Sequence, residues 1–390
     1  TRRSSDLTTT RLIAAMGAAT GKISGLSSTE LVSVGGEILD KGDYSGPAGA
    51  RLLLRDSRLQ LGVLEVARGG ILRRGLPVKR ARVAVVTNIA ADHLGHYGIN
   101  TVPELAQVKL AVHRALAPEG QLVLNADDPV VVASSKAVGA VKVWFSLDRQ
   151  NLQISDAKAM GAPCGWLENG WIVLSDGRTD TPLVAAVDVP LTLGGAARYN
   201  IENALAAALA ARALGISDDA IRSVLRSFRS DPTDNPGRAN EFLVRGARVF
   251  VDFAHNPHSI AAITSALAAL PARHRFALVT HAGDRSDLEI RALTEGVFAF
   301  KPDFVAVAEN SNYLRGRQLG DVPALIRQAC RDHGLPDAHI LMAESPAEGA
   351  QKILARLQPG DLALLLVHDE RAKIFEMLAR PTDEETDPAS

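Results

Sequence analysis

Acidic, amide, histidine and lysine side chains follow apolar runs in the first third of this 390-residue sequence. Glu65 follows LGVL, Asn88 and His93 follow VAVV, and Lys109 comes one expected helix further on. Such apolar runs are typical of parallel strands that are buried on both faces. Open α/β sheets bind ligands beyond the carboxyl ends of their strands. The stretch from Val83 to Lys109 is therefore a candidate binding loop, although a hydrated connection explains each residue taken alone.

Glu65 has two interpretations. A carboxylate at the end of a strand suits Mg²⁺, which takes oxygen ligands together with nucleotide phosphates. The same carboxylate could instead cap a helix or form a surface ion pair with Arg68. His93 and His96 do not have the spacing of a helical metal-binding pair and have no obvious third ligand, so we do not expect a zinc site.

The second half of the sequence places polar side chains in the same way. Asp252, His255 and Asn256 end one apolar run, and Asp284 and Arg285 follow the next. They could orient a ribose or a phosphate, or simply cap the following helices. Their shared position at strand ends is stronger evidence than any single residue, because two facing sheets would form a cleft lined by these loops.

The elements that must position these residues alternate between apolar strands and helices. This alternation predicts an α/β fold with a mostly parallel sheet flanked by helices. The segment RSDPTDNPGR, rich in Pro, Asp and Gly, predicts a domain boundary near residues 229–237. We expect a central domain over residues 1–230, a smaller Rossmann-like α/β domain over 236–380, and a disordered acidic tail over 381–390.

Composition excludes several classes of function. The net charge of −1 gives no indication of a nucleic-acid or membrane partner. The two cysteines, Cys164 and Cys330, are far apart and predict neither a disulfide framework nor a zinc site. We see no apolar run of membrane-spanning length and no signal peptide, so a cytoplasmic location is expected.

Several segments together resemble the Mur ligase superfamily. Within it, A-R-G-G-I-L-R is similar to the carboxy-terminal ligase region of cyanophycin synthetases. The resemblance covers nearly the whole chain in order. It is carried by E-x-A-R-G-G-I-L-R-x-G-L from Glu65, T-N-I-x-x-D-H-L-G-x-Y-G from Thr87, Lys109, L-N-A-D-D-P from Leu124, N-x-x-N-A-L-A-A-x-A-A from Asn200, P-G-R from Pro236, V-D-F-A-H-N-P from Val251, G-D-R-x-D from Gly283 and L-R-G-R from Leu314.

The resemblance implies an ATP- and Mg²⁺-dependent amide ligase with a Mur ligase-like central ATPase domain. In such enzymes ATP activates a carboxylate as an acyl phosphate, and an amino acid, here possibly arginine, then displaces phosphate. The implied partners are a peptide-like carboxylate acceptor and an amino acid. A fused or associated ATP-grasp domain and a homo-oligomer are further possibilities, and a cell-wall or folate-like acceptor is the alternative substrate.

The resemblance also implies roles for individual residues. Lys109 matches a lysine that is carbamylated in many relatives; carbamylation needs a neutral amine, so burial would have to lower its pKa. An ordinary exposed helix lysine is the alternative. The resemblance implies that Glu65 and Lys109 bind the metal and that His93 lies near the phosphates. The residues implied to bind ATP are Thr8, Thr9, Asn88, Asn203, Arg238, Asp252, His255 and Asn256. The residues implied to bind the substrate are Arg68, Asp284 and Arg285.

The sequence departs from the superfamily at one important place. Relatives begin the central domain with the phosphate-binding loop G-[TS]-x-G-K-[ST]-[TS]. The matching place here is TRRSSDLTTTRLIAAM, which contains neither glycine nor lysine. Either the loop has degenerated, which leaves a binding or scaffold protein without turnover, or part of the loop is missing and Leu7 is joined to Thr8 across a gap.

Overall fold

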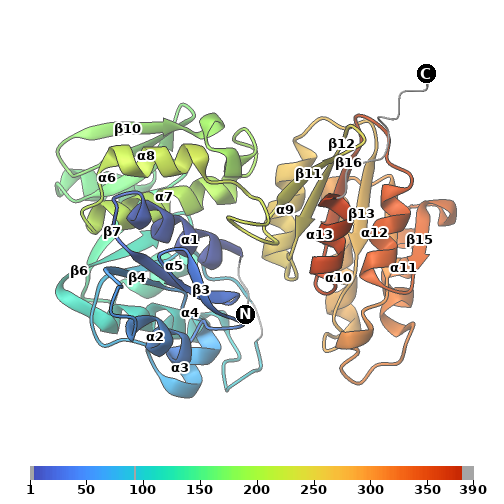
Figure 1. The fold of residues 1–390 in the computed structure, drawn as a ribbon, viewed down its shortest axis with the longest axis horizontal. Coiled ribbons are helices and arrows are strands. Elements are labelled where there is room, and N and C mark those ends of the chain that lie inside the picture. The colour runs from blue at the N-terminus through green and yellow to red at the C-terminus, as the bar shows by residue number, and fades with distance from the viewer. Residues whose placement is uncertain (1–3, 92–93, 380–390) are drawn as a thin grey trace. The chain divides into compact units, whose positions relative to one another are not determined.

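The computed structural model describes residues 4–91 and 94–379 and divides into two compact units (Figure 1). The first unit ends at Arg229 and the second begins at Ser230. The first unit combines parallel and antiparallel strand pairs, and the second unit is mostly parallel. Helices connect many of the strands in both units, which confirms the predicted α/β class. Among the described residues, no helix is both long and apolar enough to cross a membrane.

The first unit contains two sheets. A four-stranded sheet has the order β3-β2-β1-β4, in which β1 and β4 are parallel. A six-stranded sheet has the order β10-β9-β8-β7-β6-β5, in which β5 to β8 are parallel. The strands are β1 (Ser24–Ser27), β2 (Leu31–Val34), β3 (Glu37–Lys41), β4 (Leu61–Leu64), β5 (Ala81–Val86), β6 (Leu116–Asn125), β7 (Val141–Ser146), β8 (Cys164–Glu168), β9 (Trp171–Ser175) and β10 (Asp180–Ala185).

Helix α7 (Arg198–Ala213) occupies the centre of the first unit. Its many alanines let it approach its neighbours closely, and it contacts α1 (Ser4–Ala18) and strands β5 to β9. Leu12 and Met16 of α1 are fully buried in the same core. The remaining helices are α2 (Pro47–Leu54), α3 (Arg68–Arg74), α4 (Val102–Leu110), α5 (Pro129–Ser135), α6 (Leu152–Ala159) and α8 (Asp218–Ser227), with 3₁₀ turns η1 (Ala111–Ala115), η2 (Ala186–Asp188) and η3 (Pro190–Thr192).

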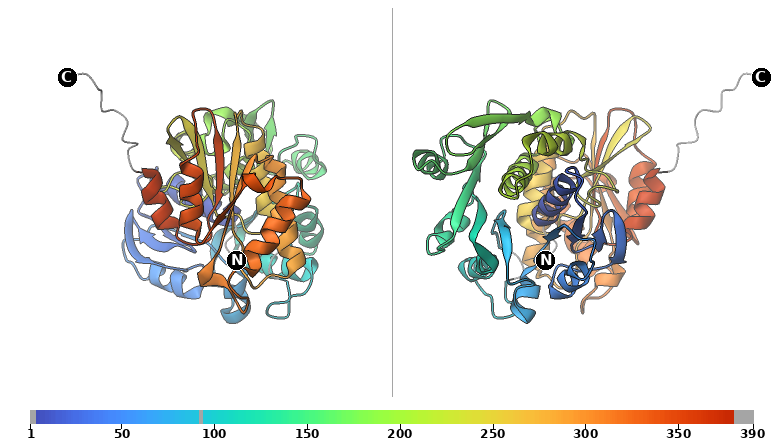
Figure 2. Two further views of the ribbon diagram at one scale, coloured as in Figure 1. Left: turned by 90° about the vertical axis from the view of Figure 1, so that its right-hand side faces the viewer. Right: turned by 60° about the vertical axis from the view of Figure 1, so that its left-hand side comes forward.

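The expectation that LGVL and VAVV are buried on both faces is wrong. These runs form β4 and most of β5, and each lies at the edge of its sheet. Val63, Val83 and Val85 are only half-buried. The right-hand view of Figure 2 shows β5, in light blue, as a ribbon separate from the four-stranded sheet. Apolar character predicted a strand but not which partners the strand would have.

The second unit is one six-stranded sheet in the order β11-β12-β16-β13-β14-β15. All neighbours are parallel except β11 and β12. Its strands are β11 (Asn240–Val244), β12 (Ala247–Asp252), β13 (Arg275–Val279), β14 (Phe304–Ala308), β15 (Ile340–Ala343) and β16 (Leu362–Leu366). Its helices are α9 (Pro257–Ala268), α10 (Asp287–Val297), α11 (Asp321–Asp332), α12 (Pro346–Leu354) and α13 (Arg371–Ala379), with 3₁₀ turns η4 (Phe298–Phe300), η5 (Ser311–Tyr313) and η6 (Asp337–His339).

Candidate functional site

Glu65 is held in place by the loop that follows β1. The residue is 5% exposed, so its carboxylate is not on the surface. Its Oε2 accepts hydrogen bonds from the backbone N–H of Thr29 at 2.8 Å and from the Thr29 hydroxyl at 3.1 Å. Arg68, which is also buried, begins α3 three residues later. The neighbouring strands β1 and β4 thus place and orient this carboxylate.

Lys109 lies in the last turn of α4 and faces inward. Its Nζ donates to Oδ2 of Asp6 at 3.3 Å and to the backbone oxygen of Asn88 at 3.2 Å. Oδ1 of Asp6 accepts a hydrogen bond from the Thr87 hydroxyl at 2.7 Å. Lys109 is therefore not an ordinary exposed helix lysine. Its Nζ forms an ion pair with the carboxylate of Asp6.

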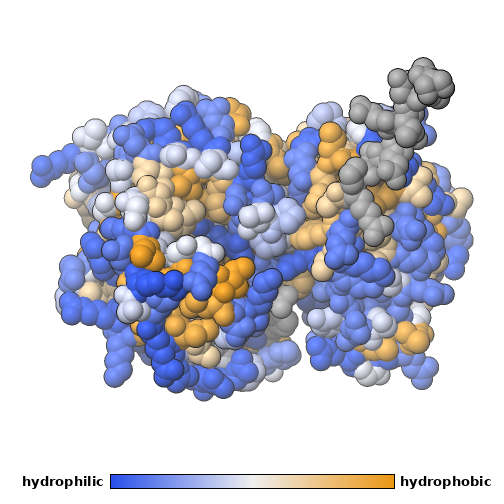
Figure 3. All heavy atoms as spheres, in the orientation of Figure 1, coloured by the Kyte–Doolittle hydropathy of each residue, from blue (hydrophilic) through white to orange (hydrophobic). Residues whose placement is uncertain are grey.

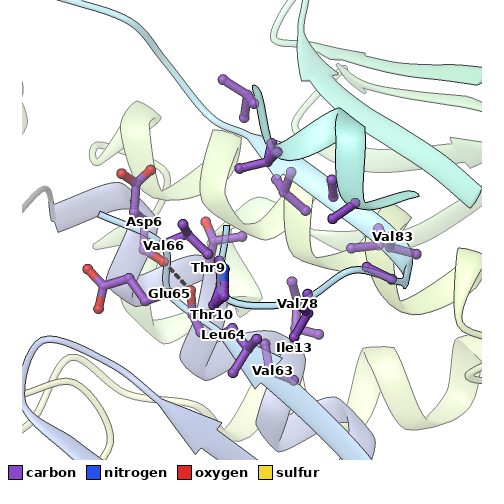
Figure 4. Close-up of a pocket in the computed structure, with 18 of the residues that line it drawn as sticks. Asp6, Thr9, Thr10, Ile13, Val63, Leu64, Glu65, Val66, Val78 and Val83 are labelled. Carbon is purple, nitrogen blue, oxygen red and sulfur yellow. Dashed lines mark hydrogen bonds between the residues drawn. The ribbon is translucent and has the colours of Figure 1, made fainter. Parts of the chain in front are cut away.

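Glu65, Lys109, Asp6 and Thr9 line one cavity of about 220 Å³ within the first unit. Most of the other lining residues are apolar and come from β4, β5 and the helices around them. Figure 4 shows Glu65 and Asp6 toward one end, with Val83 at the other. The cavity thus has a charged end, near the carboxyl ends of both strands, and an apolar remainder.

The threonines of α1 lie next to this charged end. Thr8 and Thr9 are both buried. The Thr9 hydroxyl donates to Oδ1 of Asn203 at 3.4 Å, and the Asn203 amide donates to Oδ1 of Asn200 at 3.0 Å. The side chain of Asn203 therefore lies in the packing between α1 and α7. The Asn88 amide donates to the Ser5 hydroxyl at 3.2 Å, which ties the loop after β5 to the start of α1.

Residues 4–8 form the first turns of α1 and not a phosphate-binding loop. Leu7 is fully buried in the core. The carboxylate of Asp6 lines the charged end of the cavity. No role was predicted for Asp6 from the sequence, where it stands in the polar segment RRSSDL.

Glu202 is a second residue that the sequence analysis did not single out. Burial within α7 raises the pKa of its carboxyl to about 7, and the nearby charge of Asp127 adds to this effect. The Asn125 amide donates to Oε1 of Glu202 at 3.5 Å, which partly opposes the rise. The sequence feature that could have indicated Glu202 is a glutamate on an otherwise alanine-rich helix.

The second unit brings Arg238 and Asp252 together. Asp252 accepts hydrogen bonds from the backbone N–H groups of Ala239 and Ala254, both at 2.7 Å. Burial raises the pKa of Asp252 above its ordinary value, although the charge of Arg238 opposes the rise. The Arg238 guanidinium lies over the ring of Phe253, with its carbon 5.5 Å from the ring centroid.

The loop after β12 also contains His255 and Asn256. Asn256 caps α9, because its side chain accepts from the backbone N–H of Ser259 at 2.9 Å. Arg285 donates from Nη2 to the backbone oxygen of His255 at 2.7 Å. Asp284 is exposed. His93 lies outside the described residues.

The side chains at the charged end of the cavity can be compared with those that Mg²⁺ and ATP require. Two carboxylates, Glu65 and Asp6, face one cavity, and hard oxygen donors suit Mg²⁺. The described residues contain no group of three or more His, Cys, Asp or Glu side chains placed to hold a metal ion. The start of α1 does not match a phosphate-binding loop, because residues 4–8 are helical and contain neither glycine nor lysine.

Family models match most of the chain. The Mur ligase middle domain matches residues 8–211, and the Mur ligase glutamate ligase domain matches residues 237–366. The chain therefore belongs to the Mur ligase family.

Among its relatives, cyanophycin synthetase of Trichormus variabilis is 38% identical over 320 residues. That match covers 82% of this chain and 35% of the relative. The chain thus spans about a third of the length of these curated cyanophycin synthetases.

Two solved structures share the fold. FolC of E. coli, in complex with DHPP and ADP, has a TM-score of 0.67 at 21% identity, and the match covers 96% of this chain and 86% of FolC. MurF from Acinetobacter baumannii has a TM-score of 0.65 at 16% identity, covering 96% of this chain and 74% of MurF.

Proposed function

We propose that this chain is the ligase core of an ATP- and Mg²⁺-dependent enzyme that joins a carboxylate to an amino acid. The observation that carries the proposal is the charged end of the cavity in the first unit, where Glu65 and Lys109 lie together. Family membership supports the same reaction class. Activation of a carboxylate by ATP depends on charge neutralisation and positioning, which Mg²⁺ and fixed polar groups supply.

Different residues of this chain would bind the metal, the nucleotide and the substrate. Glu65, fixed by Thr29, would hold Mg²⁺. Lys109 would be a second metal ligand only as a carbamate, which requires that its ion pair with Asp6 first separates. Arg238 and Asp252 would contribute to nucleotide binding from the second unit, and Arg68, Asp284 and Arg285 to substrate binding.

The acceptor is proposed to be a peptide-like carboxylate, and the amino acid arginine. The similarity to cyanophycin synthetases over 82% of the chain supports this choice. A cell-wall or folate-like acceptor is the alternative, and the fold similarity to FolC and MurF is compatible with it.

A phosphate-release assay tests the ligase proposal. Purified protein is incubated with ATP, Mg²⁺, L-arginine and a β-aspartyl-rich peptide, and each component is omitted in turn. We expect release that needs both acceptor and amine, and that Glu65→Ala reduces by about 10²-fold or more. Glu119→Ala is the matched control, because the Glu119 side chain is 70% exposed and does not line the cavity. Equal rates in the Glu65→Ala and wild-type proteins would contradict the proposal.

A second candidate function is binding without turnover. The specific observation that favours it is the Asp6–Lys109 ion pair, which places a carboxylate where relatives have a phosphate-binding loop. This proposal expects no amine-dependent phosphate release from the wild-type protein. It also expects that Asp6→Asn, which removes this carboxylate without changing the buried Leu7, strengthens Mg·ATP binding measured by calorimetry. Amine-dependent turnover by the unchanged chain would refute this second proposal.

A further inference from the structure

The first unit contains a second cavity, of about 510 Å³, which shares no lining residue with the cavity around Glu65. Pro163, which directly precedes β8, lines it, and so does Gln121, which lies opposite Val141, the first residue of β7. The second cavity is therefore at the amino ends of β7 and β8. Glu65, in contrast, follows the carboxyl end of β4. A ligand in the second cavity would thus bind apart from the residues proposed for the reaction.

Arg212 is fixed in the wall of the second cavity by an ion pair. It lies in the last turn of α7, and Asp218 lies in the first turn of α8. Nε and Nη2 of Arg212 donate to Oδ1 and Oδ2 of Asp218 at 2.7 and 2.5 Å, respectively. No described residue accepts a hydrogen bond from Nη1, although the side chain is only 20% exposed. A guanidinium held in this way still offers the N–H groups of Nη1 to a ligand.

Asp176 supplies a negative charge to the same cavity from the turn between β9 and β10. Its Oδ1 accepts hydrogen bonds from the backbone N–H groups of Thr179 at 2.7 Å and Arg178 at 2.8 Å. These bonds, with the charge of Arg212 as a smaller cause, hold the pKa of Asp176 below its ordinary value. Within the described part of the chain, Oδ2 accepts no hydrogen bond, so it remains available to a donor on a ligand.

Gly177 fixes the position of this turn. It has a φ of +97°, and a Cβ added to it would lie 1.9 Å from the backbone oxygen of Gly161. Only glycine allows so close an approach of two backbone segments. The turn therefore packs directly against the residues that lead into β8, and Asp176 is held at the cavity by backbone packing.

The two opposite charges face one cavity without pairing with each other. Arg212 and Asp176 both line it, and the charge of Arg212 acts on Asp176, but the ion pair that Arg212 forms among the described residues is with Asp218. Space for a ligand thus remains between the guanidinium and the second carboxylate. Other parts of the wall are apolar and buried, as at Val143 and Leu209.

We propose that the second cavity binds a free α-amino acid with an uncharged side chain, whose carboxylate accepts from Arg212 and whose ammonium group donates to Asp176. A simple anion would meet two carboxylates, and a simple cation would meet the guanidinium, whereas a zwitterion pairs with both charges. Asp218 is already paired with Arg212, so no charged group of the wall is left for a charged side chain.

The surroundings of the cavity agree with a small polar ligand. Figure 3 shows mainly hydrophilic side chains along the upper edge of the first unit, where Figure 1 places β10 and α8. An apolar protein partner would need a continuous apolar patch instead. The last turns of α7 also line both cavities, since Leu209 and Arg212 face the second cavity and Ala210 and Leu214 face the first. A bound amino acid would therefore contact a helix that forms part of the wall of the cavity around Glu65.

Calorimetric titration of the full chain with each amino acid that has an uncharged side chain is the first test. We expect binding of at least one of them. Its N-acetyl derivative, which lacks the ammonium group, and its amide, which lacks the carboxylate, should bind about tenfold or more weakly. Absence of binding by every such amino acid at millimolar concentration would overturn the proposal, and so would equal affinity for the two derivatives and the parent.

Substitutions in the wall are the second test. Asp176→Asn keeps an oxygen that can accept from the turn and removes the charge, so it should weaken binding of the amino acid about tenfold and leave binding of the N-acetyl derivative unchanged. Arg212→Lys should weaken binding of both compounds, because the bidentate pair with Asp218 no longer fixes the cation. Asp219→Asn is the matched control, since the Asp219 side chain is 93% exposed and does not line the cavity.

Unfolding in urea establishes that each variant is folded before its affinity is measured. Binding that Asp176→Asn leaves unchanged would place the amino acid elsewhere and refute the inference, as would an equal loss in Asp219→Asn. The inference does not rest on the proposed ligase activity, because these experiments measure binding without ATP or acceptor.

Discussion

Glu202→Gln removes a carboxyl that stays protonated to a higher pH in the folded chain than in the unfolded chain. Burial, with the charge of Asp127 as a smaller cause, raises the pKa of Glu202 from 4.5 to about 7. Because the folded chain then binds a proton more tightly than the unfolded chain, the stabilisation is complete below pH 4.5. It is lost as pH rises through about 7. This change in pKa corresponds to a loss of up to about 3 kcal/mol of unfolding free energy.

Glutamine keeps the shape of the side chain and cannot ionise. We therefore expect the difference in unfolding free energy, glutamine variant minus wild type, to become more positive by up to about 3 kcal/mol between pH 5 and pH 8. Groups that titrate equally in both proteins cancel in this difference. Tryptophan fluorescence in urea is a suitable assay, because all three tryptophans, Trp144, Trp166 and Trp171, lie in the first unit.

Glu119→Gln serves as the control for this measurement. The Glu119 side chain is 70% exposed and lies 3.9 Å from Arg80, so its removal should change stability little at either pH. A difference for Glu202→Gln that does not vary with pH would refute the reasoning. It would mean that Glu202 is ionised in the folded protein and that water or a cation reaches its carboxylate.

Three further predictions concern single residues. Asp6→Asn removes the charge partner of Lys109. We expect it to lower the unfolding free energy of the first unit by about 1–2 kcal/mol in the urea assay, more than Glu119→Gln does. Equal effects of the two substitutions would show that the ion pair does not stabilise the first unit. Asn256→Ala removes the N-cap of α9 and should lower the stability of that helix by about 1 kcal/mol, measured as faster amide exchange at Ser259. Ser345→Ala is the control, because Ser345 caps α12 instead. Unchanged exchange at Ser259 in Asn256→Ala would contradict the capping role. Burial lowers the pKa of His281 well below its ordinary value, so its contribution to the second unit is complete above pH 6.5 and is lost as pH falls below it. Amide exchange in β13, corrected for intrinsic rates, should therefore accelerate on acidification in the wild type more than in His281→Asn, and parallel pH profiles would refute this.

Much of the fold follows from the sequence. The alternation of apolar runs and helices predicted the α/β class, because period and composition report which face of an element is buried. The order of strands does not follow from these patterns. β4 and β5 look like central strands in sequence, yet each ends a sheet in the structure. Pairing depends on which strands meet in space, and no local pattern encodes that.

The candidate site was predicted in part. Glu65 and Lys109 were singled out as strand-end and helix residues, and they line one cavity. Asp6 was missed because its significance comes from an ion pair with a residue 103 positions away. Glu202 was missed for a similar reason, since burial and the charge of Asp127 exist only in the folded chain. Asn203 was assigned to ATP from family resemblance, and its contact with Thr9 between two helices was not foreseen.

The position of β16 determines when the second unit can assemble during synthesis. β16 is the last strand to be made, yet it pairs with both β12 and β13 in the middle of the sheet. Until it emerges from the ribosome, β12 and β13 have no common neighbour, and their inner edges are open to other chains. The second unit must therefore complete its core late, and nascent chains that stop before Leu362 would expose apolar strands to aggregation.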